Sequence, residues 1–231
     1  MRGSDRGRHL ATSTFESGMT PQMLDIPRMP PHFGRMTSQL DMFAEGPALP
    51  EGFRYEAGLL TVTEQAALLA DIRPLPFREL EFQGFLGKRR VVSFGWKYDF
   101  NTRELRKSDD IPGFLLPLRE KAALFAGLAP EALQQVLVTE YSPGAGIGWH
   151  KDKAVFGEVV GISLGAACTF RLRRREGGGW QRRSLVAEPG SLYLLSGLAR
   201  SEWEHSIPPV GALRHSVTFR NFRGESGAGA R

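Results

Sequence analysis

After Gln135 the chain is a succession of short apolar runs, and this pattern constrains the fold more than any other feature of the sequence. Gly, Pro and charged residues separate the runs, as turns separate the strands of a β structure. The runs are VLVTEY, EVVGISL, CTFRLRR, SLVAE, SLYLLSG and RHSVTFRNF. Several short strands at this spacing form a sandwich, a barrel or a jelly roll.

Helical patterns precede this β region. TVTE at residues 61–64 forms a capping box in front of an apolar helical face. That face consists of Leu68, Leu69 and Ile72. A second helix is predicted for Pro112–Gly127 and a short one for APEALQQ, residues 129–135, while Arg89–Tyr98 is typical of a further strand or hairpin. The predicted class is therefore α+β, a β core with helices packed on one side.

The chain is expected to form one folded domain. At 231 residues and 41% hydrophobic content it can bury one substantial core. Residues 1–40 are rich in Met, Pro, Gly, Ser, Thr and Arg without helical or strand periodicity, so we expect a disordered N-terminal extension. The domain is predicted to span residues 49–223, followed by a disordered tail at residues 224–231.

Cysteine content and hydropathy point to the cytoplasm. The single cysteine, Cys168, excludes an internal disulfide and a thiolate metal cage, and its apolar surroundings predict a buried, reduced thiol. No apolar run reaches the length of about 18 residues that a membrane helix needs, and the N-terminus lacks the apolar segment of a signal peptide. We therefore expect a cytoplasmic protein that stays out of membranes.

The charge balance favours a polyanionic partner. The formal net charge is +5 and the sequence pI is about 9.6. Such a balance is common among proteins that bind nucleic acid, although many basic proteins bind none. Charge alone therefore supports a nucleic-acid partner only weakly.

The segment GAGIGWHKDK, Gly144–Lys153, places a histidine and an aspartate two residues apart. In a strand such residues point to one face, so His150 and Asp152 are expected to lie side by side. An isolated H-x-D pair is more often a hydrogen-bonded surface pair. Here the glycines leave space, and a third candidate ligand, His205, follows in SEWEHSIPPV. Two histidines and one carboxylate form the facial triad that binds non-haem Fe(II) and leaves coordination positions open.

Other sites fit the same segment less well. GAGIGW lacks the G-x-G-x-x-G spacing of a nucleotide-binding loop, and GFLGK, Gly84–Lys88, lacks Walker spacing. A Ser-His-Asp hydrolase is disfavoured because a histidine beside an acid on one strand face is better placed to chelate a metal than to relay a proton. A zinc site with the same three ligands stays open.

The strand RHSVTFR, residues 214–220, distinguishes iron from zinc. Its period of two separates a polar face from an apolar one. The polar face consists of Arg214, Ser216, Thr218 and Arg220. Two inward arginines are costly to bury without an anion, whereas a salt-bridged outer face is the simpler alternative. A dicarboxylate such as 2-oxoglutarate would pair with both guanidiniums, its keto acid end could bind iron, and Tyr141 could add a hydroxyl.

Together these runs resemble the AlkB family of Fe(II)- and 2-oxoglutarate-dependent dioxygenases. EYSPGAGIGWHKDK, SLYLLSGLARSEWEHSIPPV and RHSVTFR carry the resemblance over residues 139–222. It implies a double-stranded β-helix, a jelly-roll form, that uses Fe(II), 2-oxoglutarate and O₂. The implied metal ligands, which are also the catalytic residues, are His150, Asp152 and His205. The implied 2-oxoglutarate contacts are Tyr141, Arg214 and Arg220.

Three positions depart from the family pattern. Thr139 and Ser216 stand where the founding pattern has asparagine, and both keep the ability to hydrogen-bond to the co-substrate. Ala154 stands where the family's repair enzymes commonly carry an acid that meets the alkylated base. The last departure bears on which base is recognised and not on the oxidation.

The resemblance implies oxidative dealkylation of an N-alkylated base in DNA or RNA, of the DNA repair type. GFLGKRRVVSFGWKYDF interleaves basic and aromatic residues, which suits phosphate contacts and base stacking. We expect Lys88 and Arg89 to contact phosphate and Trp96 or Tyr98 to form the pocket wall; an ordinary strand is the alternative. RLRRREGGGWQRR, Arg171–Arg183, is predicted to be a hairpin that clamps a backbone or only solubilises an edge strand.

Two other functional classes stay open. The same scaffold could hydroxylate or demethylate a protein or a small molecule, in which case the basic runs would be incidental. A nucleic-acid-binding module without enzymatic activity would bind without metal and would not need His150. The sequence indicates no obligate protein partner.

Overall fold

The computed structural model describes residues 48–82, 85–99 and 104–224, without the side chains of residues 80–82, 85–88 and 99. The disordered segments predicted for residues 1–40 and 224–231 lie outside these ranges, apart from Gly224, and stay predictions.

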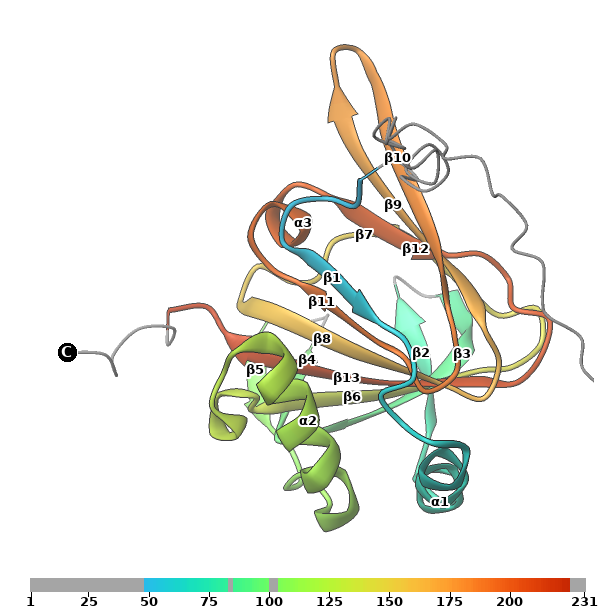
Figure 1. Ribbon diagram of the computed structural model, residues 1–231. Coiled ribbons are helices and arrows are strands. Elements are labelled where there is room, and N and C mark those ends of the chain that lie inside the picture. Colours follow the sequence, from blue (N-terminus) through green and yellow to red (C-terminus); the bar gives the residue numbers. More distant parts are fainter. Residues whose placement is uncertain (1–47, 83–84, 100–103, 225–231) are drawn as a thin grey trace, which may run out of the picture. The chain divides into compact units, whose positions relative to one another are not determined.

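Two antiparallel sheets form the body of the described chain (Figure 1). The larger sheet has the strand order β1-β11-β8-β13-β6-β3-β2 and the smaller one the order β10-β9-β12-β7. The strands of the larger sheet are β1 (Phe53–Glu56), β2 (Arg78–Phe82), β3 (Phe85–Phe94), β6 (Gln135–Tyr141), β8 (Phe156–Leu164), β11 (Leu192–Leu195) and β13 (Arg214–Phe222). Those of the smaller sheet are β7 (Ile147–His150), β9 (Cys168–Glu176), β10 (Gly179–Ala187) and β12 (Glu204–Ile207).

The order of the strands is that of a jelly roll. From β6 to β13 the chain passes back and forth between the two sheets, except at the hairpin of β9 and β10, which both lie in the smaller sheet. All strand pairs between the described residues are antiparallel. The predicted α+β class with a double-stranded β-helix core is thereby confirmed.

Helix α1 (Val62–Ile72) begins at the predicted capping box. The Glu64 amide donates to Thr61 Oγ1 at 3.2 Å, and the Thr61 amide donates to the Glu64 carboxylate at 2.8 Å. Ile72 is fully buried, and Leu68 and Leu69 pack against the same apolar cluster. The predicted helical face is therefore the one that packs against the larger sheet.

The second helix is shorter than predicted. A 3-10 turn at Gly113–Leu115 precedes α2 (Leu116–Ala126), which ends before Gly127. The segment APEALQQ contains only a 3-10 turn, Pro130–Ala132. A further short helix, α3 (Gly197–Ser201), was not predicted, because five residues between two strands carry too little periodicity to be recognised.

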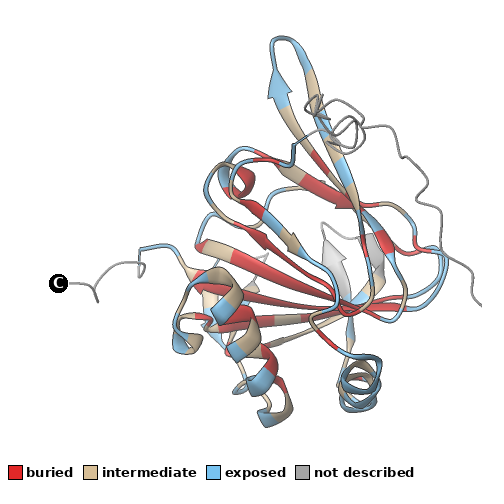
Figure 2. Ribbon diagram, viewed as in Figure 1, coloured by how far each residue is buried: buried red, intermediate tan, exposed pale blue. Residues whose placement is uncertain are grey.

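Two apolar clusters lie on opposite faces of the larger sheet. One fills the space between this sheet and the helices α1 and α2; its members include Ile72, Leu115, Val138, Ile162 and Phe219. The other lies between the two sheets and contains Phe53, Tyr141, Phe170, Leu172 and Tyr193, among others. Figure 2 shows that the strands of the larger sheet carry long buried stretches. The space between the sheets is therefore where a buried site can form.

The segment predicted as one strand or hairpin, Arg89–Tyr98, is divided at Gly95. β3 ends at Phe94, and β4 (Trp96–Asp99) pairs with β5 (Glu104–Lys107) in a separate two-stranded sheet. Gly95 has φ +73°, donates to Asp109 O at 2.6 Å and accepts from the Ser108 amide at 3.0 Å. A left-handed residue with both backbone groups engaged changes the direction of the chain at this point.

No helix in the described part of the chain is long and apolar enough to cross a membrane.

Gly95→Ala should destabilise the fold more than an equivalent change at an open position. An added Cβ would meet the backbone oxygen of Gln134, and the φ of +73° disfavours any side chain. Gly58→Ala is the control, because Gly58 has φ +72° with nothing within 4 Å of the added Cβ. We expect Gly58→Ala to lower the unfolding free energy by about 1–2 kcal/mol. For Gly95→Ala we expect a further loss of about 1–3 kcal/mol in urea unfolding. Equal losses for the two variants would contradict this account.

Candidate active site

His150 and His205 face each other across two neighbouring strands of the smaller sheet. β7 and β12 pair so that His150 lies opposite His205, and their ring centroids are 4.2 Å apart. His150 Nδ1 donates to the carbonyl oxygen of Gly148 at 2.9 Å. This hydrogen bond places the proton on Nδ1 and leaves Nε2 with the lone pair that a metal requires.

Asp152 is not in the strand where the H-x-D pattern placed it. β7 ends at His150, and Asp152 lies in the irregular segment that follows. The carboxylate nevertheless reaches the histidines, with Oδ2 3.6 Å from His205 Nε2. The prediction that the three residues meet is therefore correct, whereas the strand geometry given for it is wrong.

Two arginines hold Asp152 and its segment. Arg220 donates from Nε to Asp152 Oδ1 at 2.9 Å, and its Nη2 lies 2.8 Å from the same oxygen. Arg200, in α3, donates to the carbonyl oxygens of Lys153, Phe156 and Gly157 at 2.6, 2.9 and 2.9 Å. Arg200 was not predicted; its only signal in the sequence is its place in the short segment between two strands.

The charges of the three residues suit metal binding. Burial, and after it the neighbouring His150, lower the pKa of His205 to about 3, against the opposing effect of Asp152. Burial also lowers the pKa of His150. Burial alone would raise the pKa of Asp152, but Arg220, the two histidines and Arg200 hold it well below its usual range. At neutral pH the set is two neutral imidazoles and one carboxylate.

These donors match Fe(II) in chemical type and in protonation state. Their side chains are not arranged as a finished metal centre, since within residues 48–82, 85–99 and 104–224 no three His, Cys, Asp or Glu groups are positioned to hold an ion. One oxygen of Asp152 is occupied by Arg220. His150, Asp152 and His205 are therefore the residues that would hold iron, after side-chain adjustment.

The five residues predicted to contact 2-oxoglutarate share one face of the larger sheet. β13 and β6 pair so that Arg214 lies opposite Tyr141 and Ser216 opposite Thr139. Arg220 lies opposite Gln135 and donates from Nη1 to its Oε1 at 2.9 Å. The structure thus brings all five predicted positions to the wall that faces the smaller sheet.

Arg214 is the most unusual of these residues. It is 0% exposed, and its Nε, Nη1 and Nη2 have no hydrogen-bond partner in the described part of the chain. Its guanidinium lies 4.9 Å from the centroid of the Tyr141 ring. A buried guanidinium without a carboxylate is costly, so an anion bound at this point would stabilise it.

Tyr193 is a second wall residue that sequence reasoning missed. Its ring covers Gly161 of the neighbouring strand so closely that a Cβ at Gly161 would overlap it. Burial raises the pKa of its hydroxyl, with Tyr141 adding to the effect and Arg214 opposing it. The alternation of SLYLLSG and the glycine in VVGIS together could have indicated this ring.

GISLG, residues 161–165, matches the G-x-S-x-G pattern of hydrolase nucleophiles. Ser163 lies inside β8, opposite Ser216, and not at a turn between a strand and a helix. Its side chain is fully buried. A nucleophile elbow is therefore excluded at this position.

The residues predicted to contact substrate separate into different environments. Arg89 lies opposite Tyr141 on β3; burial lowers the pKa of its guanidinium, and Tyr141 and Asp152 oppose this. Tyr98 lies next to the segment that carries His150 and Asp152, with its ring centroid 5.1 Å from Lys153 Nζ. Trp96 packs edge-on against Phe222 at 5.6 Å and lines a surface groove of about 750 Å³. The side chain of Lys88 lies outside the described residues.

Comparison with known proteins decides the family. The family model of the 2OG-Fe(II) oxygenase superfamily matches residues 52–223. The chain belongs to this superfamily. Its family is thus that of the 2-oxoglutarate-dependent dioxygenases, as the sequence predicted.

Relatives of the chain carry AlkB names, so the AlkB resemblance is confirmed. The chain is 30% identical over 190 residues to the alkylated DNA repair protein ALKBH8 homolog of Arabidopsis thaliana, covering 71% of this chain and 53% of that one. It is 28% identical over 169 residues to the Mus musculus tRNA (carboxymethyluridine(34)-5-O)-methyltransferase ALKBH8, covering 70% and 25%. The chain thus spans between a quarter and about half of these relatives.

A solved structure supports the fold. The structure of OsALKBH1 superimposes with a TM-score of 0.59 at 17% sequence identity, covering 75% of this chain and 98% of that one. This likeness concerns the fold alone.

Replacing either histidine should remove metal binding without unfolding the protein. We expect His150→Ala and His205→Ala to lose Co(II) or Mn(II) affinity by at least about tenfold, measured by calorimetry, because each removes one ligand. His215→Gln is the control. His215 is a buried histidine on the face of β13 that points away from the site, with its Nε2 3.4 Å from Glu140 Oε2. Asp152→Ala should lower the metal affinity too, and in addition lower the free energy of unfolding by about 3–5 kcal/mol, because it leaves Arg220 buried without its carboxylate partner. Unchanged metal affinity in both histidine variants would contradict the ligand assignment.

Proposed function

We propose that His150, Asp152 and His205 bind Fe(II), that Arg214 and its neighbours bind 2-oxoglutarate, and that the enzyme oxidatively dealkylates an N-alkylated base in nucleic acid. Bound iron and 2-oxoglutarate supply the oxidising chemistry, using O₂ and releasing CO₂ and succinate. The chain itself has to hold these groups, place the target carbon and exclude water.

One observation carries the co-substrate assignment, namely the unpartnered guanidinium of Arg214. A guanidinium binds a carboxylate through paired, charge-assisted hydrogen bonds, so a dicarboxylate satisfies it. Tyr141 and Ser216 border the same place on the sheet and offer hydroxyl groups. Arg220 is already paired with Asp152, which leaves Arg214 as the principal anchor.

The surrounding residues keep the site in place and dry. Arg220 orients the Asp152 carboxylate, and Arg200 fixes the backbone of the segment that follows. Tyr193 and Phe170 belong to the apolar cluster between the sheets, and the Phe170 ring stacks on His205 with centroids 5.4 Å apart. An apolar wall beside the metal ligands excludes water from the reacting carbon.

Support for a nucleic-acid substrate comes from the names of the relatives and from the charge of the chain. The Arabidopsis relative is named as an alkylated DNA repair protein, and the mouse relative is named for a reaction on tRNA. The chain has a net charge of +5. Both observations favour nucleic acid over a protein or small-molecule substrate.

The charges at the site favour a base that is uncharged. Ala154, where repair enzymes commonly carry an acid, is exposed and cannot balance a cationic base. Arg89 is close enough to Asp152 and Arg220 for their charges to act on it. A cationic alkylated adenine or cytosine would meet Arg89 without an acid at position 154 to offset its charge, whereas an alkylated guanine or uracil would not be repelled.

Arg214→Met should weaken 2-oxoglutarate binding and leave the free protein at least as stable. The loss of a charge-assisted contact costs about 1.5–3 kcal/mol of binding. The free protein loses only a buried charge without a partner. Calorimetric titration and thermal unfolding measure the two effects. Arg106→Met on the exposed strand β5 is the control, and Arg214→Lys should retain part of the affinity. An unchanged 2-oxoglutarate affinity in Arg214→Met would exclude the assignment.

Formaldehyde release tests the substrate. We expect release from single-stranded DNA or RNA that contains N1-methylguanine or N3-methyluracil, more than from N1-methyladenine or N3-methylcytosine. Arg89→Gln should shift the ratio toward the cationic bases. Unmethylated oligonucleotide is the control. If no polymer releases aldehyde although metal and 2-oxoglutarate are bound, the substrate is a protein or a small molecule.

A further inference from the structure

We propose that the outer face of the smaller sheet binds the sugar-phosphate backbone of a single-stranded nucleic acid and leads it to the active site. The proposal rests on the proposed function and concerns a surface that lies on the opposite side of the sheet from the metal-ligand candidates.

The outer face is a row of basic and aromatic side chains. Along β9 the buried residues Cys168, Phe170 and Leu172 alternate with Arg171, Arg173 and the exposed Arg175. On β10, Arg182 lies opposite Arg173 and Trp180 lies opposite Arg175. Alternation therefore places three arginines of β9 and two residues of β10 on the outer face.

The guanidinium groups of this face lie over tryptophan rings. Arg173 lies between two of them, 4.0 Å from the centroid of Trp180 and 4.4 Å from that of Trp149. Arg175 lies 4.4 Å from Trp180, and Arg171 lies 5.0 Å from Trp149. A stacked guanidinium keeps its N–H edge available, and a phosphate oxygen is the acceptor that this edge fits.

The positive charge of this face is only partly neutralised. Arg173 Nε donates to Glu204 at 2.6 Å and Arg171 Nε donates to Ser206 at 3.1 Å, which leaves terminal N–H groups on both. In the part of the chain that the structure describes, no ion pair involves Arg171, Arg175 or Arg182. A polyanion would complete this face.

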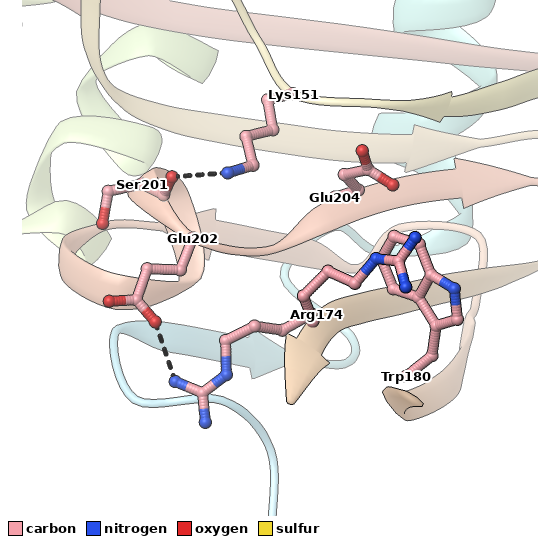
Figure 3. Close-up of a pocket in the computed structure, with 7 residues that line it drawn as sticks. Lys151, Arg174, Trp180, Ser201, Glu202 and Glu204 are labelled. Atoms are coloured by element: carbon pink, nitrogen blue, oxygen red, sulfur yellow. Dashed lines mark hydrogen bonds and ion pairs between the residues drawn. The ribbon is translucent and has the colours of Figure 1, made fainter. Parts of the chain in front are cut away.

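The row continues to the active site. A surface hollow of about 370 Å³ is lined by Lys151, Arg174, Arg175, Trp180, Ser201, Glu202 and Glu204. Figure 3 shows Trp180 and Glu204 on one side of it and Lys151 on another. Lys151 stands between His150 and Asp152 in the chain, and its ammonium donates to Ser201 O at 2.9 Å. A polymer that lies along the row therefore arrives at the segment that carries two metal-ligand candidates.

The spacing and position of the row favour a single strand. Every second residue of a strand repeats after about 6.7 Å, so the arginines of β9 form a line suited to a repeating anion and not to a lone one. The row and the two histidines lie on opposite faces of the same sheet, and β7 is the edge strand of that sheet. A flexible strand can bend around this edge into the space between the sheets, whereas a stiff duplex cannot.

The test is binding of unmodified oligonucleotides to the full-length protein without iron, followed by fluorescence anisotropy at several salt concentrations. Arg175→Gln with Arg182→Gln removes two exposed charges from the row. Arg73→Gln with Arg78→Gln is the matched control. Both residues are exposed, and Arg73 directly follows α1 while Arg78 is the first residue of β2. We expect the first pair to lower the salt slope by about 1.4 and the affinity roughly ten- to thirtyfold at about 0.1 M salt. The control pair should change the affinity less than about twofold.

Further variants test the stacking. Trp180→Ala should weaken binding because Arg173 and Arg175 lose the ring that orients them, and Trp180→Phe should restore most of it. All variants should keep their 2-oxoglutarate affinity, which shows that the site between the sheets is intact.

Three results would overturn the proposal. Equal losses in the two charge pairs would show diffuse attraction and not a surface. Stronger binding of duplex than of single strand would exclude the path around β7, and stronger binding of polyglutamate than of oligonucleotide would indicate an acidic peptide. Binding as expected, with no aldehyde from any methylated polymer, would leave the surface in place and overturn the proposed function alone.

Discussion

The buried ion pair between Asp152 and Arg220 is the interaction on which the site depends. Arg220 contacts Asp152 Oδ1 through two nitrogens and uses its third for Gln135. Asp152 follows a strand of the smaller sheet, and Arg220 lies in the larger one. The pair therefore ties the two sheets together at the place where a metal would bind. Because both groups are buried, loss of either would leave an uncompensated charge, so each fixes the position of the other.

Alternation explains why much of this site could be predicted from the sequence. A period of two in RHSVTFR was sufficient to separate the inward face of β13 from the outward one, and pairing with β6 then brought Tyr141 beside Arg214. The same rule failed at Asp152, because β7 ends at His150, two residues before Asp152. Asp152 is positioned by its ion pair with Arg220 and by the hydrogen bonds from Arg200 to backbone carbonyls of the segment that follows, and such long-range contacts leave no periodic signal.

The two basic runs of the sequence lie in different environments in the fold. The sequence predicted phosphate contacts for Lys88 and Arg89, and for Arg171–Arg183 a hairpin that clamps a backbone or only solubilises an edge strand. In the fold, Arg89 turns to Tyr141 between the sheets, where burial lowers the pKa of its guanidinium. The arginines of β9 instead project from a sheet whose other face is already filled by Phe170 and Leu172. Which face of a strand is buried depends on the neighbouring strands, and composition does not contain that information.

The two faces of the smaller sheet carry different groups: metal-ligand candidates on the inner face, and basic and aromatic side chains on the outer face. His150 and His205 point inward from β7 and β12, whereas Trp149 and Glu204, their neighbours in the chain, belong to the outer face. Each histidine is thus the direct neighbour in the chain of a residue on the outer face. A polymer bound along the arginine row would therefore contact, from the outer face, the same two strands that carry the metal-ligand candidates on their inner face.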